Sequence, residues 1–432
     1  MSMLLQQQLP LRWLYVDFNS YFASVEQQMN PALRGKPVIV VPVDTDSTCA
    51  IAASYEAKAR GIKTNTPVYE AKRMCPGLIC VVGDHKHYVH YHHQLIKEIE
   101  NHIHVSAVCS IDEMACYLMD NENSDKRASE IAASIKKGIA RNVGDYIKCS
   151  VGVAPNKFLA KVATDMQKPD GLTILHQEDL PHKLYGLKLK DIPGIGRNME
   201  HRILMAGIND VCTLLSLSAS EMRKIWGGVW GERMWFWLRG VDLPEIETHR
   251  SSVGHSHVMA PELRMPERAR YVARRLTMKA TARLRRMGYY AQTLTFSARF
   301  ENGLRVEGSE HCYRAQDSIT FLHMLERIWQ TCMEYAAQGG RGGNWRIRKV
   351  SMALHGLVAE DVARQPELIP ALQEEEMHER ERSERMSKAL DRINHRFGKD
   401  SVTLGMMPAA SRNFSGTKVA FNRIPDVEEF IE

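Results

Sequence analysis

Three acidic residues in two distant stretches of the chain limit the folds that it can adopt. Asp17 lies in WLYVDFNSYFASVE, and Asp112 and Glu113 lie in VCSIDEMACYL, each in a context typical of the end or turn of a strand. A compact cluster of such carboxylates can hold a pair of divalent cations about 4 Å apart. The pattern therefore predicts a fold that brings the two stretches together around a two-metal site for phosphoryl transfer.

The first stretch predicts a strand followed directly by a helix. Trp13 to Phe18 is apolar enough for a buried strand, and Asn19 and Ser20 can cap a helix whose apolar residues recur at helical spacing. Asp17 would then lie at the carboxyl end of a strand, beside a helix N-terminus. Free backbone N–H groups and the positive end of the helix dipole can receive a polyphosphate there.

The second stretch predicts an antiparallel hairpin with the acid pair at its turn. Its two apolar runs are Ile103 to Cys109 and Met114 to Leu118. Adjacent residues of a strand point to opposite faces, so Asp112 and Glu113 can serve one site only if the backbone turns there. Acids at a turn are more often simply solvated, and only the joint pattern with Asp17 favours the metal site.

Residues 146–175 predict a further strand, helix, turn and strand. The segments are YIKCSVGVA, NKFLAKVATDM, the turn Lys168 to Gly171, and LTIL. Lys157 and Lys161 are four residues apart and share one helix face. Such lysines are usually solvated, but beside a carboxylate cluster they could neutralise phosphate charge.

Several segments, in chain order, resemble the Y-family translesion DNA polymerases of the DinB/UmuC type. They are DFNSYFASVE, SYEAKARGIK, CSIDE, SVGVAPNKFLAKVATDMQKPDG and DIPGIG. The resemblance covers about residues 12 to 355, and co-linear motifs are far more specific than any single one. It implies an error-prone, template-directed DNA polymerase that inserts deoxyribonucleotides opposite damaged template in DNA repair and SOS mutagenesis.

The resemblance implies an α+β, multidomain fold arranged like a right hand. A ferredoxin-like palm would occupy residues 11–30 and 80–175, small fingers 31–79, and a helical thumb with a helix-hairpin-helix 176–245. An α+β little-finger domain that binds DNA would occupy 253–360. Residues 361–432 would form a C-terminal tail with a charged, solvated helix.

The same resemblance assigns roles at the site. Asp17, Asp112 and Glu113 match the catalytic acids, which with the Phe18 backbone carbonyl would bind two Mg²⁺ ions, for which Mn²⁺ could substitute. One metal would activate the primer 3′-hydroxyl, and the other would steady the departing pyrophosphate. Phe22 matches the steric gate, which would exclude the 2′-hydroxyl of a ribonucleotide. Apart from the resemblance, Phe22 is simply a candidate core residue.

Further nucleotide contacts follow from the resemblance. The positions are Tyr21, Tyr55, Lys58 and Lys161. Lys58 is a departure, because many DinB-like members have arginine there. A point charge and a planar bidentate fork bind a triphosphate differently, so the contacts with the incoming nucleotide can differ too.

Two segments are candidates for contacts with DNA. Gly194 and Gly196, in DIPGIG, would let backbone N–H groups approach a phosphate, although an ordinary turn between helices explains them as well. From Glu262 to Tyr290 the chain has nine Lys or Arg residues against two acids, which is typical of a surface that binds the DNA backbone. The candidates within this basic segment are Arg274, Arg275 and Lys279, and the alternative is a solvated helix face.

Composition excludes several other classes of protein. Among 432 residues there is no apolar run of membrane-spanning length and no signal peptide, so a cytoplasmic protein without membrane contact is expected. Nine cysteines without a CxxC pair indicate reduced thiols. The five histidines within His85 to His93 are interpreted as the start of a surface helix. They are not favoured as metal ligands, because Mg²⁺ prefers oxygen ligands.

The expected partners are primer-template DNA and deoxyribonucleoside triphosphates. Gln365 to Ile369 lies where relatives often carry a sliding-clamp peptide but lacks its aromatic end, so clamp binding is a weaker expectation, as are contacts with other mutagenesis proteins. Two alternatives stay open: a catalytically silent mutagenesis scaffold subunit and a palm-fold nucleotidyl cyclase. The intact acids oppose the first, and the predicted thumb and basic little finger oppose the second.

Overall fold

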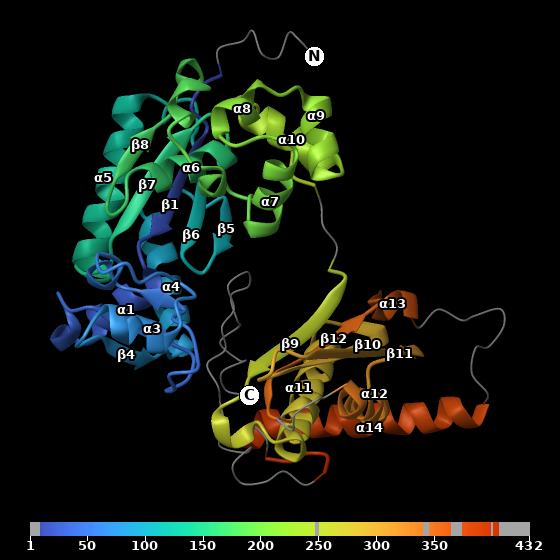
Figure 1. Cartoon of the computed structure of the whole chain (residues 1–432). Coiled ribbons are helices and arrows are strands. Elements are labelled where there is room, and N and C mark those ends of the chain that lie inside the picture. Colours follow the sequence, from blue (N-terminus) through green and yellow to red (C-terminus); the bar gives the residue numbers. More distant parts are fainter. Residues whose placement is uncertain (1–8, 247–249, 340–344, 364–373, 399–400, 406–432) are drawn as a thin grey trace. The chain divides into compact units, whose positions relative to one another are not determined.

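The computed structural model describes residues 9–246, 250–339, 345–363, 374–398 and 401–405 (Figure 1). The chain divides into two compact units, the first extending to Ile246 and the second following it. In the described ranges no helix is long and apolar enough to cross a membrane.

The first unit is built on a five-stranded sheet in the order β5-β6-β1-β7-β8. Neighbouring strands are antiparallel except for the parallel pair β7 and β8. The central strand β1 is almost wholly buried, which explains its apolar sequence. The predicted first strand and hairpin are confirmed. The strands are β1 (Trp13–Phe18), β5 (Ala107–Ser110), β6 (Glu113–Tyr117), β7 (Cys149–Ala154) and β8 (Leu172–Ile174).

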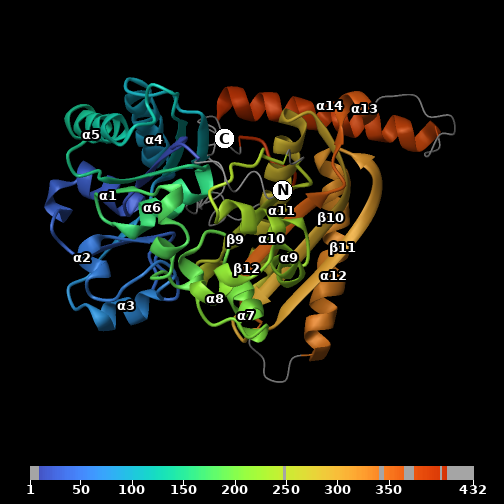
Figure 2. The same cartoon turned by 90° about the horizontal axis from the view of Figure 1, so that it is seen from above.

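Helices cover this sheet. The helix α6 (Lys157–Met166) packs on β1 and β7, while α4 (His85–Glu100) and α5 (Asp125–Asn142) lie side by side (Figure 2). The predicted helix at the histidine run is therefore confirmed, but His85 and His92 are buried, so α4 is not simply a surface helix. The helix α1 (Tyr21–Met29) follows β1 as predicted. The predicted helix cap at Ser20 is wrong. The backbone of Ser20 lies in the left-handed region (φ 50°), and its side chain makes no capping hydrogen bond.

A smaller three-stranded sheet has the order β3-β2-β4, with β2 and β4 parallel. It consists of β2 (Val38–Val41), β3 (Ala52–Ala53) and β4 (Ile79–Val82), accompanied by α2 (Tyr55–Lys58) and α3 (Val68–Met74). This sheet extends to Val82, beyond the fingers boundary expected at residue 79.

Four short helices complete the first unit: α7 (Arg197–Met205), α8 (Val211–Ser216), α9 (Ala219–Trp226) and α10 (Val229–Trp237). Before α7 the chain forms only a 3₁₀ turn, Leu189–Asp191, instead of the full helix expected there. Ile192 is already extended (φ −83°, ψ 122°), as the residue before a proline usually is. Gly194 then turns the chain with φ +86°, which favours glycine.

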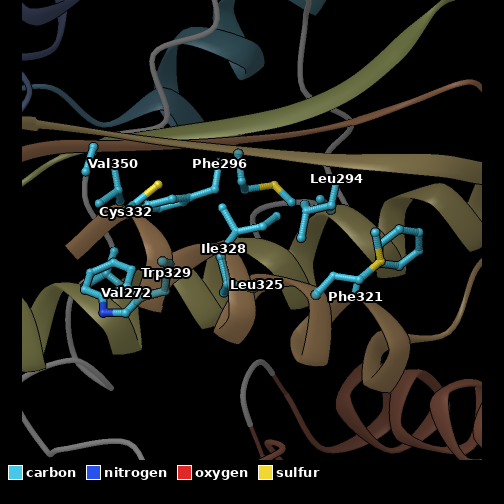
Figure 3. Close-up of a cluster of buried hydrophobic side chains, with 14 of the residues drawn as sticks. Val272, Leu294, Phe296, Phe321, Leu325, Ile328, Trp329, Cys332 and Val350 are labelled. Atoms are coloured by element: carbon cyan, nitrogen blue, oxygen red, sulfur yellow. The ribbon is translucent and has the colours of Figure 1, made fainter. Parts of the chain in front are cut away.

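The second unit contains a four-stranded antiparallel sheet in the order β11-β10-β12-β9. Helices α11 and α12 cover one face, and their apolar side chains, including Phe321, Ile328 and Trp329, interlock with Phe296 and Val350 of the sheet (Figure 3). The elements are β9 (Ser252–Val258), α11 (Pro266–Arg286), β10 (Tyr289–Phe300), β11 (Arg305–Ala315), α12 (Ser318–Gly339), β12 (Ile347–His355), β13 (Val358–Ala359) and α13 (Glu360–Ala363).

The sequence predicted a solvated, charged helix in the C-terminal tail. The structure contains this helix, α14 (Glu374–Phe397), but α14 is not simply solvated. It packs against α12. Asp391 accepts two hydrogen bonds from Arg285 at 2.6 and 2.8 Å, and Ser387, which is 1% exposed, accepts one from the Ser318 amide at 3.0 Å. Ser387 and Asp391, on one face of α14, thus hold this helix in place, although its composition alone predicts exposure.

Candidate active site

The three predicted acids meet at one end of the palm sheet. Asp17, the penultimate residue of β1, lies directly opposite Glu113, the first residue of β6. Asp112 lies in the turn before β6, and its carbonyl accepts a hydrogen bond from the Phe18 amide at 2.9 Å. The backbone therefore turns at Asp112 and Glu113, which is the condition for both acids to serve one site.

Two lysines contact these acids. Lys161 binds Asp17, and its Nζ lies 2.7 Å from Glu113 Oε1. Lys168 Nζ lies 2.8 Å from Asp17 Oδ2 and 2.7 Å from Asp165 Oδ1. The expected cation Lys161 is thus at the cluster, whereas Lys157 on the same helix face pairs with Glu245. Lys168 was missed, because its KPDG segment was interpreted only as a turn.

The titration of these groups reflects their burial and mutual charge. Burial, followed by the negative charges of Glu113 and Asp17, raises the pKa of Asp112 to about 6. Burial alone would lower the pKa of Lys161, but Asp17, Glu113 and Asp165 outweigh it and raise that pKa. The acid cluster therefore stabilises positive charge close to it.

Tyr55 and Lys58 lie on α2, and the electrostatics link them to the same cluster. The Lys58 Nζ lies 4.5 Å from the centre of the Tyr55 ring. Burial and the positive charge of Lys168 lower the pKa of Lys58, while Asp17 opposes this shift. Lys161 and Lys168 thus contact the Asp17 carboxylate, and Lys58 from the fingers interacts with its charge.

The aromatic pair after β1 is buried. Phe22 is 6% exposed and stacks on Tyr88 with ring centres 4.4 Å apart. The Tyr21 hydroxyl donates to the Tyr88 carbonyl at 2.6 Å, so this side chain points into the core and its phenol is already engaged. His85 lies behind the Phe22 ring, with the centres 5.2 Å apart.

The candidate DNA contacts lie away from the acids. Gly196 precedes α7 and, with Arg197, Asn198, Met199 and Arg202, lines a surface depression. The free N–H groups of the α7 N-terminus and the two arginines make this depression suitable for an anion. Gly194 provides the turn that leads into it.

The basic helix α11 is largely engaged by its own unit. Arg274 pairs with Glu326 and donates to the Leu404 carbonyl at 3.2 Å, and Arg275 is only 6% exposed. Burial, followed by the positive charges of Lys279 and Arg275, lowers the pKa of His257 on β9 to about 4. These cations therefore face the inner side of the sheet or neighbouring helices, which the count of charges could not show.

The uncovered face of the second sheet carries a row of cations that sequence analysis missed. Arg299 on β10 lies opposite Lys349 on β12 and Arg305 on β11. The alternation of burial along β10, with Ala298 and Phe300 buried and Arg299 exposed, directs this row away from α11 and α12. The sequence signal that could have indicated this face is the alternation of polar and apolar residues in QTLTFSARF.

The acid cluster has the ligand chemistry of a site for hard divalent cations. It offers carboxylate oxygens at the end of a sheet, and burial, followed by the charges of Glu113 and Asp17, raises the pKa of Asp112. Among the described residues, no group of three acidic, histidine or cysteine side chains has metal-binding geometry. Lys161 lies between Asp17 and Glu113, and Asp112 is turned toward the Ser110 hydroxyl, 2.6 Å away.

Comparison with known proteins agrees with this fold. Residues 16–165 match the impB/mucB/samB family, residues 250–368 match its C-terminal domain, and residues 190–242 match the thumb domain of DNA polymerase-iota. DNA polymerase IV of Moorella thermoacetica is 31% identical over 397 residues, covering 89% of this chain and 93% of that protein. DNA polymerase IV 1 of Bacillus subtilis is 32% identical over 291 residues, or 66% and 69% of the two chains.

Solved structures show the same fold. A Y-family DNA polymerase chimera, Dbh-Dpo4(243-245)-Dbh, has a TM-score of 0.66 at 24% identity and covers 81% of this chain and 99% of its own. An insertion ternary complex of Dbh DNA polymerase has a TM-score of 0.51 at 23% identity, with the same coverage. The chain therefore belongs to the Y family of DNA polymerases. Within that family it is a DinB-type, translesion DNA-directed DNA polymerase.

Proposed function

We propose that this polymerase transfers nucleotides at the cluster of Asp17, Asp112 and Glu113, with two Mg²⁺ ions as cofactors and Mn²⁺ as a substitute. The convergence of β1 and the β5-β6 turn is the observation that carries this proposal, since it brings the three acids together. These carboxylates and the Phe18 carbonyl would hold the ions, which would activate the primer 3′-hydroxyl and stabilise the departing pyrophosphate.

The lysines would hold the triphosphate of the incoming deoxyribonucleotide. Lys58, Lys161 and Lys168 approach the cluster from the fingers, α6 and the segment after α6, so their charges converge where phosphates would lie. Tyr55 would add a phenol beside Lys58. Tyr21, whose side chain is engaged in the core, would contribute through its backbone at the start of α1.

Primer extension tests the catalytic proposal. The wild type should extend a primer on undamaged and abasic templates with Mg²⁺, and Glu113→Gln should not, while both bind primer-template DNA equally. Equal extension by the two proteins would remove Glu113 from the catalytic site. Binding without extension by the wild type would favour the scaffold alternative.

Phe22→Ala is expected to reduce discrimination against ribonucleotides by about 10²-fold, because the ring would no longer occupy the space of a 2′-hydroxyl. Its loss from the stack on Tyr88 should also cost about 3 kcal/mol of stability. The measurement is the ratio of kcat/KM for a deoxyribonucleotide to that for its ribonucleotide within one preparation, which is independent of the folded fraction. An unchanged ratio would leave Phe22 as a core residue only.

Primer-template DNA would bind along the uncovered face of the second sheet as well as at the α7 N-terminus. Arg299 and Lys349 lie in its cationic row, and in the described ranges no acid pairs with either. Backbone phosphates attract such cations without regard to sequence, which suits a polymerase that must accept any template.

The double variant Arg299→Ala/Lys349→Ala should weaken DNA binding and reduce the slope of log K against log salt by about 1 to 2. The matched variant Arg274→Ala removes a cation that already pairs with Glu326 and should leave the slope nearly unchanged. Fluorescence anisotropy with labelled primer-template at several salt concentrations measures both. A larger change for Arg274→Ala would return the DNA contact to α11.

Two further expectations accompany this function. We expect the protein to act in the cytoplasm, where its reduced thiols are stable. Binding of a sliding clamp through Gln365 to Ile369, and of other mutagenesis proteins, stays a prediction, because that segment lies outside the described residues.

A further inference from the structure

Tyr15 lies on the same face of the palm sheet as the acids. It precedes Asp17 by two residues on β1, so both side chains point toward α6. Tyr15 is 4% exposed, and its hydroxyl donates to Glu113 Oε2 at 2.9 Å. Since Tyr15 pairs with Ala115 and Asp17 pairs with Glu113, the phenol reaches Glu113 diagonally along the sheet.

This hydrogen bond completes the contacts of the Glu113 carboxylate. Its other oxygen, Oε1, lies 2.7 Å from Lys161 Nζ, and the same Nζ lies 5.8 Å from the centre of the Tyr15 ring. The Glu113 side chain is 24% exposed, so packing alone does not fix its orientation. With one donor on each oxygen the carboxylate cannot rotate freely, whereas with Lys161 alone it could pivot about a single contact.

We propose that Tyr15 is a positioning residue for Glu113, whose carboxylate its hydroxyl holds in the orientation that receives the catalytic cation. This inference rests on the proposed role of Glu113 in metal binding. A competing explanation is that Tyr15 only fills the core beneath α6, where its ring packs among Ala115, Leu159 and Ala160. Phenylalanine would fill that space equally well, so the hydroxyl distinguishes the two explanations.

The test compares Tyr15→Phe with the wild type in a complex with dideoxy-terminated primer-template and a deoxyribonucleoside triphosphate. Mn²⁺ affinity, measured by electron paramagnetic resonance, should fall about 10-fold, as expected for the loss of a hydrogen bond to a charged group. With an extendable primer, kcat should fall by a similar factor while KM for the nucleotide stays within about 2-fold. A core-filling role predicts no change in either quantity.

Tyr117→Phe is the matched control. Tyr117 lies on the neighbouring strand β6, is 38% exposed and packs edge-on against Trp13 instead of contacting an acid. Its variant should leave Mn²⁺ affinity and kcat unchanged. Melting temperatures of both variants would confirm that each protein is folded, and an equal loss of Mn²⁺ affinity in both would overturn the inference.

A double-mutant cycle separates this inference from the proposed function. On a Glu113→Gln background, Tyr15→Phe should no longer change Mn²⁺ affinity, because Tyr15 acts through Glu113. An undiminished effect on that background would overturn the positioning role. If Glu113→Gln alone leaves Mn²⁺ affinity unchanged, the proposed metal site fails, whatever Tyr15 does.

Discussion

Asp112→Asn is expected to abolish primer extension, by about 10³-fold or more, and at the same time to make the protein more stable at neutral pH. The loss of activity follows from removing a negative charge that would face the cations. The gain in stability follows because burial and the charges of Glu113 and Asp17 raise the pKa of Asp112 to about 6, so its ionised form is costly in the folded protein. Asparagine keeps an oxygen that can accept the hydrogen bond from Ser110.

The sign of this effect gives a specific pH dependence. The pKa of Asp112 is 3.8 without these influences and about 6 in the folded chain, so between these values the folded state binds more protons than the unfolded state. Wild-type stability therefore falls relative to Asp112→Asn as the pH rises from about 4 to 6, and the difference stays constant above that. A shift of this size corresponds to about 3 kcal/mol for a fully shielded group, and to about 2 kcal/mol for the partly exposed Asp112.

Urea unfolding in EDTA at pH 5 and pH 7.5 measures the difference. The control is Asp120→Asn, since that side chain is 87% exposed and forms only a surface ion pair with Arg12. Equal stability of Asp112→Asn and wild type at pH 7.5 would show that the cluster tolerates its charge without added cations. Full extension activity of the variant would exclude Asp112 as a ligand.

If Asp112→Asn is both inactive and more stable, then the acid is retained for its function at a cost in stability. Asp17 and Glu113 face each other across two strands, and Asp112 is joined to the same point by the Phe18 amide. A hydrophobic core alone would not select such a cluster, because like charges in partly buried positions repel each other. Lys161 and Lys168 offset part of this cost, and under the proposed function the same lysines would meet the negative charge of a triphosphate.

The strands and the acid cluster could be predicted because the signals were local. Trp13 to Phe18 is continuously apolar and became the central strand, and the polar break at Asp112 became the turn. Lys168 could not be predicted in the same way. Its position depends on how the segment after α6 folds back to Asp17, a contact between residues far apart in the chain.

The basic segment shows the opposite case, in which the local signal gives the number of cations but not their partners. Eight of the nine cations counted in this segment lie on α11, yet Arg274 and Arg285 pair with Glu326 and Asp391, acids distant in sequence. The cationic row at Arg299 arises from three strands, each contributing one residue, so no single segment stands out. Charge density along a sequence therefore locates a basic element, but tertiary pairing decides which of its charges remain available.

Gly152→Ala is expected to destabilise the palm strongly, by about 4 kcal/mol. A Cβ at this position would lie 2.0 Å from the Ala160 carbonyl oxygen and 2.7 Å from the Thr164 amide nitrogen. Both are backbone atoms of α6, so no side-chain rotation relieves the clash, and the helix must move away from β7. Glycine is required here by the close approach of a helix to a strand.

The same displacement should impair nucleotide binding, because α6 carries Lys161. A shift of about 1 Å at a positioned group can cost about 10²-fold in rate, so kcat/KM should fall even in the folded fraction. Gly186→Ala is the control, since a Cβ there meets nothing within 4 Å. Urea unfolding and steady-state insertion kinetics measure the two effects. If Gly152→Ala unfolds at the same urea concentration as Gly186→Ala, then the contact between α6 and β7 is not as close as the structure requires.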